Sequence, residues 1–214
     1  MNKEKVKRLI CQCIWLFIVG AFLGFLFETL WCYIKTGELI NKQGLWYGPF
    51  KPIYGIGLIL FTVFLYKIKD KNIIFLFLGG VIIGSVFEYA ASLFQEYSFG
   101  TSTWSYKKLS NNLNGRIYLP YSLAWGAISV IWLKYGINLF KKVFNNIYGK
   151  KFRILTIIIS IFMIYNISLT TLIVHRYAER MKNINSNNII NKYLDKKYPS
   201  WKIKKKFPNL EVKK

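Results

Sequence analysis

The sequence predicts an all-α, polytopic membrane protein with about five transmembrane helices. Several apolar runs approach or exceed 18 residues, the length at which a helix crosses about 30 Å of hydrocarbon. Basic residues gather between and after these runs. A pattern of two glycines and a glutamate also occurs twice, 60 residues apart. We therefore expect two parallel helix–loop–helix repeats, followed by a fifth helix and a basic tail.

Composition and charge indicate that the lipid bilayer is the main partner. The chain is 53% hydrophobic and carries a formal net charge of +22. In a soluble protein, such a charge would suggest that the partner is a nucleic acid. Here the basic residues flank apolar runs, where they can contact anionic headgroups and orient helices. We expect no nucleic-acid partner. The first run, residues 14–30, carries Glu28 and has no small-residue cleavage site, so it is not a signal peptide.

The helices follow the apolar runs, over residues 10–34, 49–66, 73–94, 120–140 and 154–174. Pro49 and Pro52 fall in or before the first turn of the second helix, where a missing N–H is harmless. The transmembrane domain then spans 1–174, with repeat one at about 10–66, repeat two at about 73–140 and the fifth helix at about 154–174. Residues 175–214 form a basic C-terminal tail, which we expect to be solvated.

Basic residues in the short loops predict the orientation in a bacterial cell membrane. Thirteen Lys and Arg lie in the N-terminal lead, the 67–71 link and the 134–153 region, against six in the other two loops. The N-terminus is therefore predicted to be cytoplasmic. Five crossings place the tail outside, although it holds 12 Lys and Arg. Each repeat crosses twice, so the two long loops share the extracytoplasmic face.

The first half of the repeat is a G-x3-G-x3-E stripe, formed by Gly20, Gly24 and Glu28 and again by Gly80, Gly84 and Glu88. Residues four apart lie on one face of a helix. Two glycines on that face let another backbone approach closely. The glutamate lies one turn further along, so we expect both carboxylates at a helix interface.

The second half of the repeat has the hinge pattern G-x4-P-x4-(Y/W)-G. It comprises Gly44, Pro49, Tyr54 and Gly55 in the first copy, and Gly115, Pro120, Trp125 and Gly126 in the second. Glycine permits the turn and proline begins the helix. The retained spacing suggests that both hairpins pack in the same way.

The candidate polar site consists of Glu28 and Glu88, with Lys51 and Arg116 as the nearest cations. A carboxylate at the centre of a membrane helix costs about 2.5–3.5 kcal/mol on insertion scales. In the functional interpretation, the pair binds a cation or proton or gates a path. In the structural interpretation, each glutamate bonds to a loop N–H or forms a salt bridge with Arg116 or Lys51. Both interpretations stay open.

The sequence suggests no metal site or cofactor. His175 is the only histidine and is expected at the interface, near a helix end. Cys11, Cys13 and Cys32 give no disulfide framework, and no histidine or second cysteine pair accompanies them. We therefore expect neither a His-based metal cluster nor a Ser-His-Asp site.

Several blocks of residues 13–140 resemble a known family. They are Phe27-Glu28-Thr29, Gly48-Pro49-Phe50-Lys51-Pro52-Ile53-Tyr54-Gly55, Trp104-Ser105-Tyr106 and Asn112-Leu113-Asn114-Gly115-Arg116. They resemble the CmpB-like family of small bacterial membrane proteins, the ABC-transporter type IV permeases. The family's Trp-Asp-Tyr occurs here with Ser105 in place of the acid. The resemblance implies a multi-pass inner-membrane protein and a permease.

The resemblance implies a permease-like transport component rather than an enzyme. The chain has no G-x4-G-K-(S/T) loop, so it would need a separate ATP-binding subunit. We expect that subunit to dock at residues 141–151. Five helices are few for a translocation path, which favours pairing with a second copy or another membrane chain. The alternative is a scaffold or regulator of the envelope, and a membrane lipid enzyme ranks last.

Overall fold

The computed structural model describes residues 2–213, and its secondary structure is almost entirely helical. The helices are α1 (Lys3–Thr36), α2 (Pro52–Leu65), α3 (Ile73–Phe99), α4 (Leu119–Ile131), α5 (Ile137–Ile147), α6 (Lys150–Met181), α7 (Ile189–Lys197) and α8 (Ser200–Lys206). A 3-10 turn, Tyr66–Ile68, extends α2, and a π-helical turn, Trp132–Gly136, joins α4 to α5. The predicted all-α class is confirmed.

Two short antiparallel ladders complete the secondary structure. Strand β1 (Thr101–Ser102) pairs with β4 (Glu211–Val212), and β2 (Asn112–Leu113) pairs with β3 (Ile117–Tyr118). Strands β2 and β3 form a small hairpin within the loop between α3 and α4. The β1–β4 pair joins that loop to the C-terminal segment, so the loop and the tail lie at the same end of the molecule.

Within residues 2–213, four helices are long and apolar enough to cross a membrane: α1, α3, the continuous helix of α4 and α5, and α6. Helix α2 with its 3-10 turn is a shorter apolar helix. The predicted membrane protein with about five helices is therefore confirmed. Most spanning helices are longer than expected, and α6 continues seven residues past the predicted end at residue 174.

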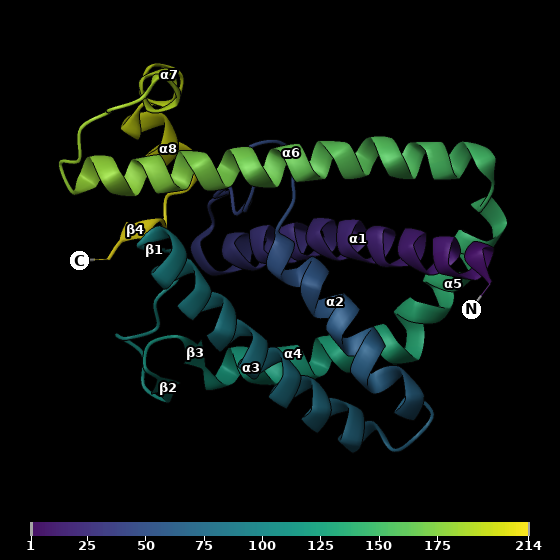
Figure 1. Cartoon of the computed structure of the whole chain (residues 1–214). Coiled ribbons are helices and arrows are strands. Elements are labelled where there is room, and N and C mark those ends of the chain that lie inside the picture. The colour runs from purple at the N-terminus through teal and green to yellow at the C-terminus, as the bar shows by residue number, and fades with distance from the viewer. Residues whose placement is uncertain (1, 214) are drawn as a thin grey trace.

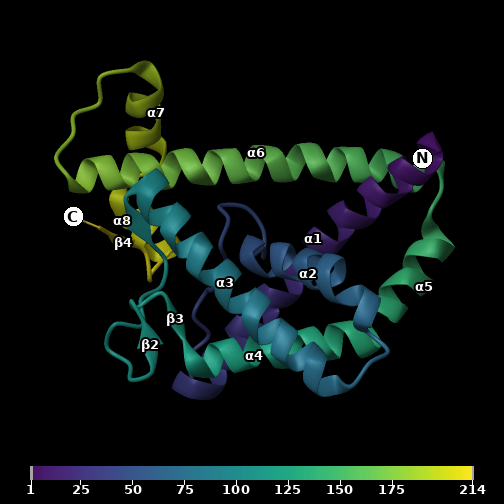
Figure 2. The same ribbon diagram turned by 60° about the horizontal axis from the view of Figure 1, so that its bottom comes forward.

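The helices run between two ends of the molecule (Figures 1 and 2). The N-terminus, the α2–α3 link and the α5–α6 link lie at one end. The loop strands, α7 and α8 lie at the other. This placement of the tail beside the two long loops agrees with the odd number of crossings that the sequence predicts. Which end faces the cytoplasm stays a prediction.

The first repeat packs α1 against α2 through glycine. A Cβ atom on Gly20 would lie 2.9 Å from the Cα of Gly55. One on Gly24 would overlap the Tyr54 side chain, and one on Gly55 would overlap the Phe17 carbonyl. Only glycine therefore allows these two backbones to come so close.

The second repeat makes the corresponding contacts between α3 and α4. A Cβ atom on Gly80 would lie 3.1 Å from the Cα of Gly126 and would overlap the Ser129 hydroxyl. One on Gly84 would lie 2.5 Å from the Cβ of Trp125. Trp125 and Gly126 occupy the positions that Tyr54 and Gly55 hold in the first copy, so both hairpins pack in the same way.

The second helix begins later than predicted. Its expected start was residue 49, but α2 begins at Pro52. Lys51 is extended, with φ of −127°, and its N–H donates to the Ala21 carbonyl of α1 at 2.9 Å. That bond to α1 holds Lys51 in the extended conformation. The fourth helix also differs from the expected 120–140, because the π-helical turn at Trp132–Gly136 interrupts it.

Residues 182–213 form a folded unit on the end of α6, whereas a solvated tail was expected. Its buried side chains pack against α6 and the loops: Leu194, Tyr198, Ile203, Phe207 and Leu210, with Ile173, Val174 and Tyr177 from α6. Leu194 lies on α7 and Ile203 on α8, whereas Tyr198, Phe207 and Leu210 follow the ends of these helices. All five are buried, while the lysines between them stay mostly at the surface.

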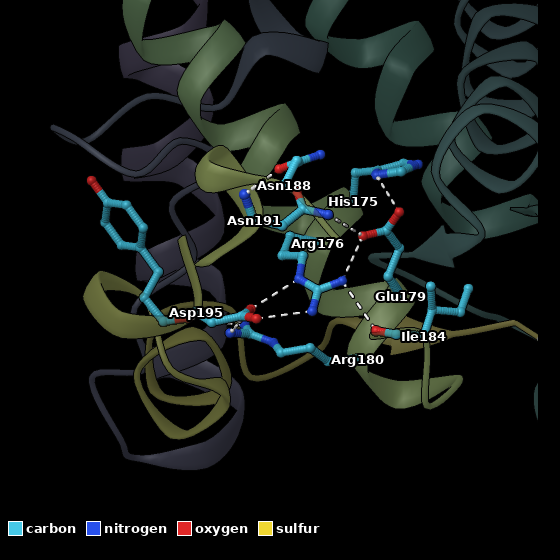
Figure 3. A network of polar contacts seen from close by, with 9 residues as sticks. His175, Arg176, Glu179, Arg180, Ile184, Asn188, Asn191 and Asp195 are labelled. Atoms are coloured by element: carbon cyan, nitrogen blue, oxygen red, sulfur yellow. Dashed lines mark hydrogen bonds and ion pairs between the residues drawn. The ribbon is translucent and has the colours of Figure 1, made fainter. Parts of the chain in front are cut away.

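A network of charged side chains locks this unit to α6 (Figure 3). The guanidinium of Arg176, 3% exposed, donates to both carboxylate oxygens of Asp195 at 2.9 and 2.8 Å. Arg180 also donates to Asp195, at 3.0 Å, and Glu179 accepts from Arg176 at 2.8 Å. Bidentate pairing of this kind is strong and directional. His175, expected near a helix end, lies within α6 and is half exposed beside Glu179.

Gly55→Ala should destabilise the folded protein by about 1–3 kcal/mol, because the new methyl group would overlap the Phe17 carbonyl oxygen. Thermal unfolding in mild detergent measures the change. Gly149→Ala is the matched control, since a Cβ there meets no atom within 4 Å among the described residues. Equal melting temperatures for the two variants would contradict the close packing of α1 and α2.

Asp195→Asn should loosen the tail by about 3 kcal/mol, because Arg176 stays buried without its main partner. Hydrogen bonds from Arg176 hold the pKa of the Asp195 carboxyl below its usual range. A lowered carboxyl pKa stabilises the folded state above the unfolded pKa. The contribution is therefore complete at neutral pH and is lost as the pH falls below about 4.

Hydrogen exchange of residues 189–213 measures this loosening. Wild-type protein should lose protection on acidification, and Asp195→Asn should lack protection already at neutral pH. Asp70→Asn is the control, because its exposed pair with Lys69 lies at the other end of the molecule. Unchanged protection in Asp195→Asn would show that apolar packing alone holds the tail.

Candidate functional site

The site begins with a non-helical segment that dips into the helix bundle. After α1, residues 44–51 return to the level of Ala21, near the middle of α1. The Tyr47 N–H donates to the Asn166 side-chain oxygen at 3.0 Å, and the Asn166 amide donates to the Tyr47 carbonyl at 2.7 Å. Asn166 lies at the middle of α6 and is fully buried. Irregular backbone at membrane depth needs such partners, because lipid supplies none.

Other contacts hold the same segment. The Trp46 N–H donates to the Thr170 hydroxyl at 2.8 Å, one turn along α6 from Asn166. The Gly44 N–H donates to the Phe50 carbonyl at 2.8 Å, which closes the hinge that contains Pro49. These bonds position Lys51 at the start of α2, facing α1.

Glu28 lies opposite that start. Its carboxylate forms an ion pair with the Lys51 ammonium and accepts a hydrogen bond from the Tyr54 hydroxyl at 2.8 Å. About a quarter of each charged side chain is exposed: 27% for Glu28 and 23% for Lys51. The carboxylate of Glu28 is therefore neutralised by Lys51. Lys51 belongs to residues 44–51, which we call the re-entrant segment.

Glu88, the equivalent residue of the second repeat, has a different environment. It is 5% exposed and accepts hydrogen bonds from the Tyr106 hydroxyl at 2.9 Å and the Trp125 indole N–H at 3.1 Å. Trp125 is the counterpart of Tyr54. Both donors are neutral, so these hydrogen bonds leave the charge of an ionised Glu88 uncompensated.

Both glutamates line one cavity of about 310 Å³ between the two hairpins. Lys51, Tyr54 and Trp125 also line it. The structure thus brings together five of the residues that the sequence singled out. Further lining residues that sequence reasoning did not place in the site are Cys32, Lys35, Lys42, Thr103, Trp104, Tyr106, Tyr121 and Asn209.

Arg116 lies elsewhere. The guanidinium forms an ion pair with Glu96 at 2.7 Å and donates to the Ser92 hydroxyl at 3.0 Å. It makes none of the expected ion pairs with Glu28 or Glu88 among the described residues. The reason is geometric, since Ser92 and Glu96 continue the face of Glu88 by one and two turns, toward the loop end of α3.

The second hinge positions Tyr106 rather than a charge. Gly115 adopts φ of +69°, which glycine tolerates without strain, and its carbonyl accepts the Tyr106 N–H at 2.8 Å. This turn brings the Tyr106 side chain to Glu88, and α4 begins just beyond it at Leu119, with Pro120 in its first turn. The Trp104 indole donates to the Arg116 carbonyl at 3.0 Å, which fixes the same loop.

Two signals could have located the residues that sequence reasoning missed. Trp104 and Tyr106 belong to the Trp-x-Tyr block that carried the family resemblance. Asn166 is the single amide within the long apolar run of α6. A buried polar residue in a membrane helix generally contacts a polar partner.

Within residues 2–213, the structure has no group of three or more His, Cys, Asp or Glu that could hold a metal ion. The three cysteines are free, and Cys32 lies in the cavity wall. The acidic side chains that line the cavity are Glu28 and Glu88, and Glu28 pairs with Lys51.

Two helical hairpins around a cavity that holds two carboxylates, with a further spanning helix, define a polytopic membrane protein. The family model described as "Putative ABC-transporter type IV" matches residues 15–171, which is 157 of the 214 residues. The chain belongs to this family. No curated protein and no solved structure matches it. The family resemblance found in the sequence is thereby confirmed.

Asn166→Leu should displace the re-entrant segment, because it leaves the Tyr47 N–H and C=O without their Asn166 partner at membrane depth, where lipid supplies none. The cost should be about 2–4 kcal/mol for the two groups. Hydrogen exchange at Tyr47 and the melting temperature measure it. Asn138→Leu, at an exposed asparagine of α5, is the matched control. Retained protection at Tyr47 would show that Asn166 does not hold the segment.

Proposed function

We propose that the chain is the membrane-spanning permease component of a bacterial transport system, with its polar site at Glu28, Glu88 and Lys51. One observation carries this proposal. The two glutamates of the repeat, 60 residues apart in sequence, line a single cavity at the interface of the hairpins. Family membership supports the transport class.

The difference between the two carboxylates indicates what the site can do. Glu28 has a cationic partner, whereas Glu88 has two neutral hydrogen-bond donors. A proton or a cationic group entering the cavity would complete the charge balance at Glu88. Lys51, which lines the same cavity, could alternatively shift toward Glu88 and release Glu28. In this proposal the site holds one positive charge in two alternative arrangements, at Glu28 or at Glu88. Two such states are what a gate or an ion-coupling site requires.

The energy source is proposed to be a separate ATP-binding subunit. Its proposed docking surface is the end that holds the N-terminus, α5 and the α5–α6 link. Helix α5 exposes Leu139, Val143 and Ile147 at four-residue spacing, with 49–64% of each side chain accessible. Lys141, Lys142, Lys150 and Lys151 lie beside this stripe in sequence. An apolar stripe flanked by lysines suits either a partner subunit or headgroups.

Purification of the tagged chain from its own membranes in mild detergent, followed by mass spectrometry, tests the partner. A stoichiometric nucleotide-binding subunit is expected. Recovery of the chain alone, or only with itself, across several detergents would contradict an ATP-driven permease and favour a scaffold or regulator.

Glu28→Gln and Glu88→Gln then test the site in that complex. Each variant should lower ATP hydrolysis in nanodiscs at least tenfold while the melting temperature and complex yield stay within the wild-type range. Glu38→Gln, at an exposed glutamate of the loop after α1, is the matched control. Full activity of both variants would exclude the glutamates from the transport mechanism, and failure of both to accumulate in the membrane would assign them to structure.

A further inference from the structure

A second cavity of about 300 Å³ lies beside the glutamate cavity. Its wall is formed by the re-entrant segment, the outer end of α6, the loop after α3 and residues 207–210 of the tail. The two cavities share six lining residues, namely Lys42, Lys51, Ile53, Thr103, Trp104 and Asn209. They are therefore adjacent, and two lysines stand at their junction.

Two lysines line the second cavity, and one of them, Lys51, also pairs with Glu28. The charged lining residues of this cavity are Lys42 and Lys51, and no Asp or Glu lines it among residues 2–213. Lys42 has no ion-pair partner within that described part of the chain. Pro52 and Ile53, the first residues of α2, also line the cavity, so the positive end of a 14-residue helix adds to the lysines.

Neutral hydrogen-bonding side chains also line the cavity, from Asn41, Gln43, Gln95, Thr103, Thr170, Thr171 and Asn209. The hydroxyls of Thr103 and Thr170 and the amide of Gln43 already donate to protein acceptors. Asn41, Gln95, Thr171 and Asn209 retain amide or hydroxyl hydrogens that can donate to an oxyanion without adding charge. This part of the wall is therefore suited to a carboxylate or phosphate group.

The rest of the wall is apolar. It consists of Leu45, Phe99, Ile167, Val174, Phe207 and Leu210. Ile167 lies on α6 and is 37% exposed on the molecular surface, where the membrane would contact it. A chain of methylene groups could therefore lie along α6 and reach the lysines from the lipid side.

We propose that this second cavity binds an amphipathic anion, with its carboxylate or phosphate head between Lys42 and Lys51 and its apolar chain along α6 and the tail. The ligand is either a membrane phospholipid or a free acid from the water phase, since both present the same chemistry. The site adjoins the glutamate site and shares Lys51 with it. It does not depend on the proposed transport function.

Lys51 links the two sites. An anion at Lys51 competes with Glu28 for the same ammonium group. Binding in the second cavity would therefore weaken the Lys51–Glu28 pair and change the charge of the first cavity. This is a direct electrostatic coupling through one shared side chain.

Titration calorimetry on the full chain, in nanodiscs of zwitterionic phosphatidylcholine, tests the ligand class. The probes are decanoate, decyl phosphate, decyltrimethylammonium and decanol, with empty nanodiscs as reference. The two anions should bind at least tenfold more tightly than the cation and the alcohol. Equal binding of decyltrimethylammonium and decanoate would overturn the proposal. Inorganic phosphate binding as tightly as decyl phosphate would also overturn it, because the apolar wall would then contribute nothing.

Two matched pairs of variants locate the site. Lys42→Gln should weaken decanoate binding at least tenfold, whereas Lys108→Gln, at an exposed lysine that lines neither cavity, should not. Thr171→Trp should fill the cavity and abolish binding, whereas Leu172→Trp, at the exposed neighbour on α6, should leave it intact. Unchanged binding in both Lys42→Gln and Thr171→Trp would overturn the assignment.

Native mass spectrometry of the chain from its own membrane identifies the source. A retained anionic phospholipid that Lys42→Gln loses would support the site and name the membrane as the source. A retained fatty acid lost in the same variant would support a free acid. Glu28→Gln and Glu88→Gln leave Lys42 and the second cavity in place, so failure of the transport proposal and failure of this one give different results.

Discussion

The paired hydrogen bonds between the Asn166 side chain and the Tyr47 backbone are the interaction on which the site depends. A segment without helical structure at membrane depth must find protein partners for its N–H and C=O groups. Asn166 and Thr170 of α6 and the Ala21 carbonyl of α1 supply them. Because those bonds fix the segment, α2 begins at Pro52 and Lys51 meets Glu28. The walls of both cavities depend on the same hydrogen bonds, because Lys51 of this segment lines both cavities.

The glycine stripes give the two hairpins one geometry, and the loops then give them different charges. Gly20 and Gly80 bring equivalent helix pairs to the same close approach, so Glu28 and Glu88 reach the same cavity. The first carboxylate meets a lysine from its own hairpin. The second meets Tyr106, which arrives through a longer loop with a glycine turn at Gly115. A repeated backbone with unlike partners produces a cavity with an asymmetric charge distribution, which neither hairpin could form alone.

Local periodicity explains what the sequence could predict, and distant contacts explain what it could not. Apolar runs and the glycine spacing are properties of single helices, so the helices and the interface position of Glu28 could be predicted. The start of α2 depends on Ala21, thirty residues away, and the partner of Arg116 depends on the length of α3. The prediction of a solvated tail was wrong because its few apolar residues, such as Leu194 and Ile203, form a core only when they pack against α6.

The folded tail has a consequence for the cavities. Asn209 lines both of them, and Phe207 and Leu210 close the second. These residues are held in place by the packing of α8 and by the ion pair between Arg176 of α6 and Asp195 of α7. Since Asn166 and Thr170 lie on the same helix, α6 carries both the supports of the re-entrant segment and the anchor of the tail. A rotation or shift of α6 would therefore move both walls of the second cavity together, and Lys51 would transmit that movement to Glu28.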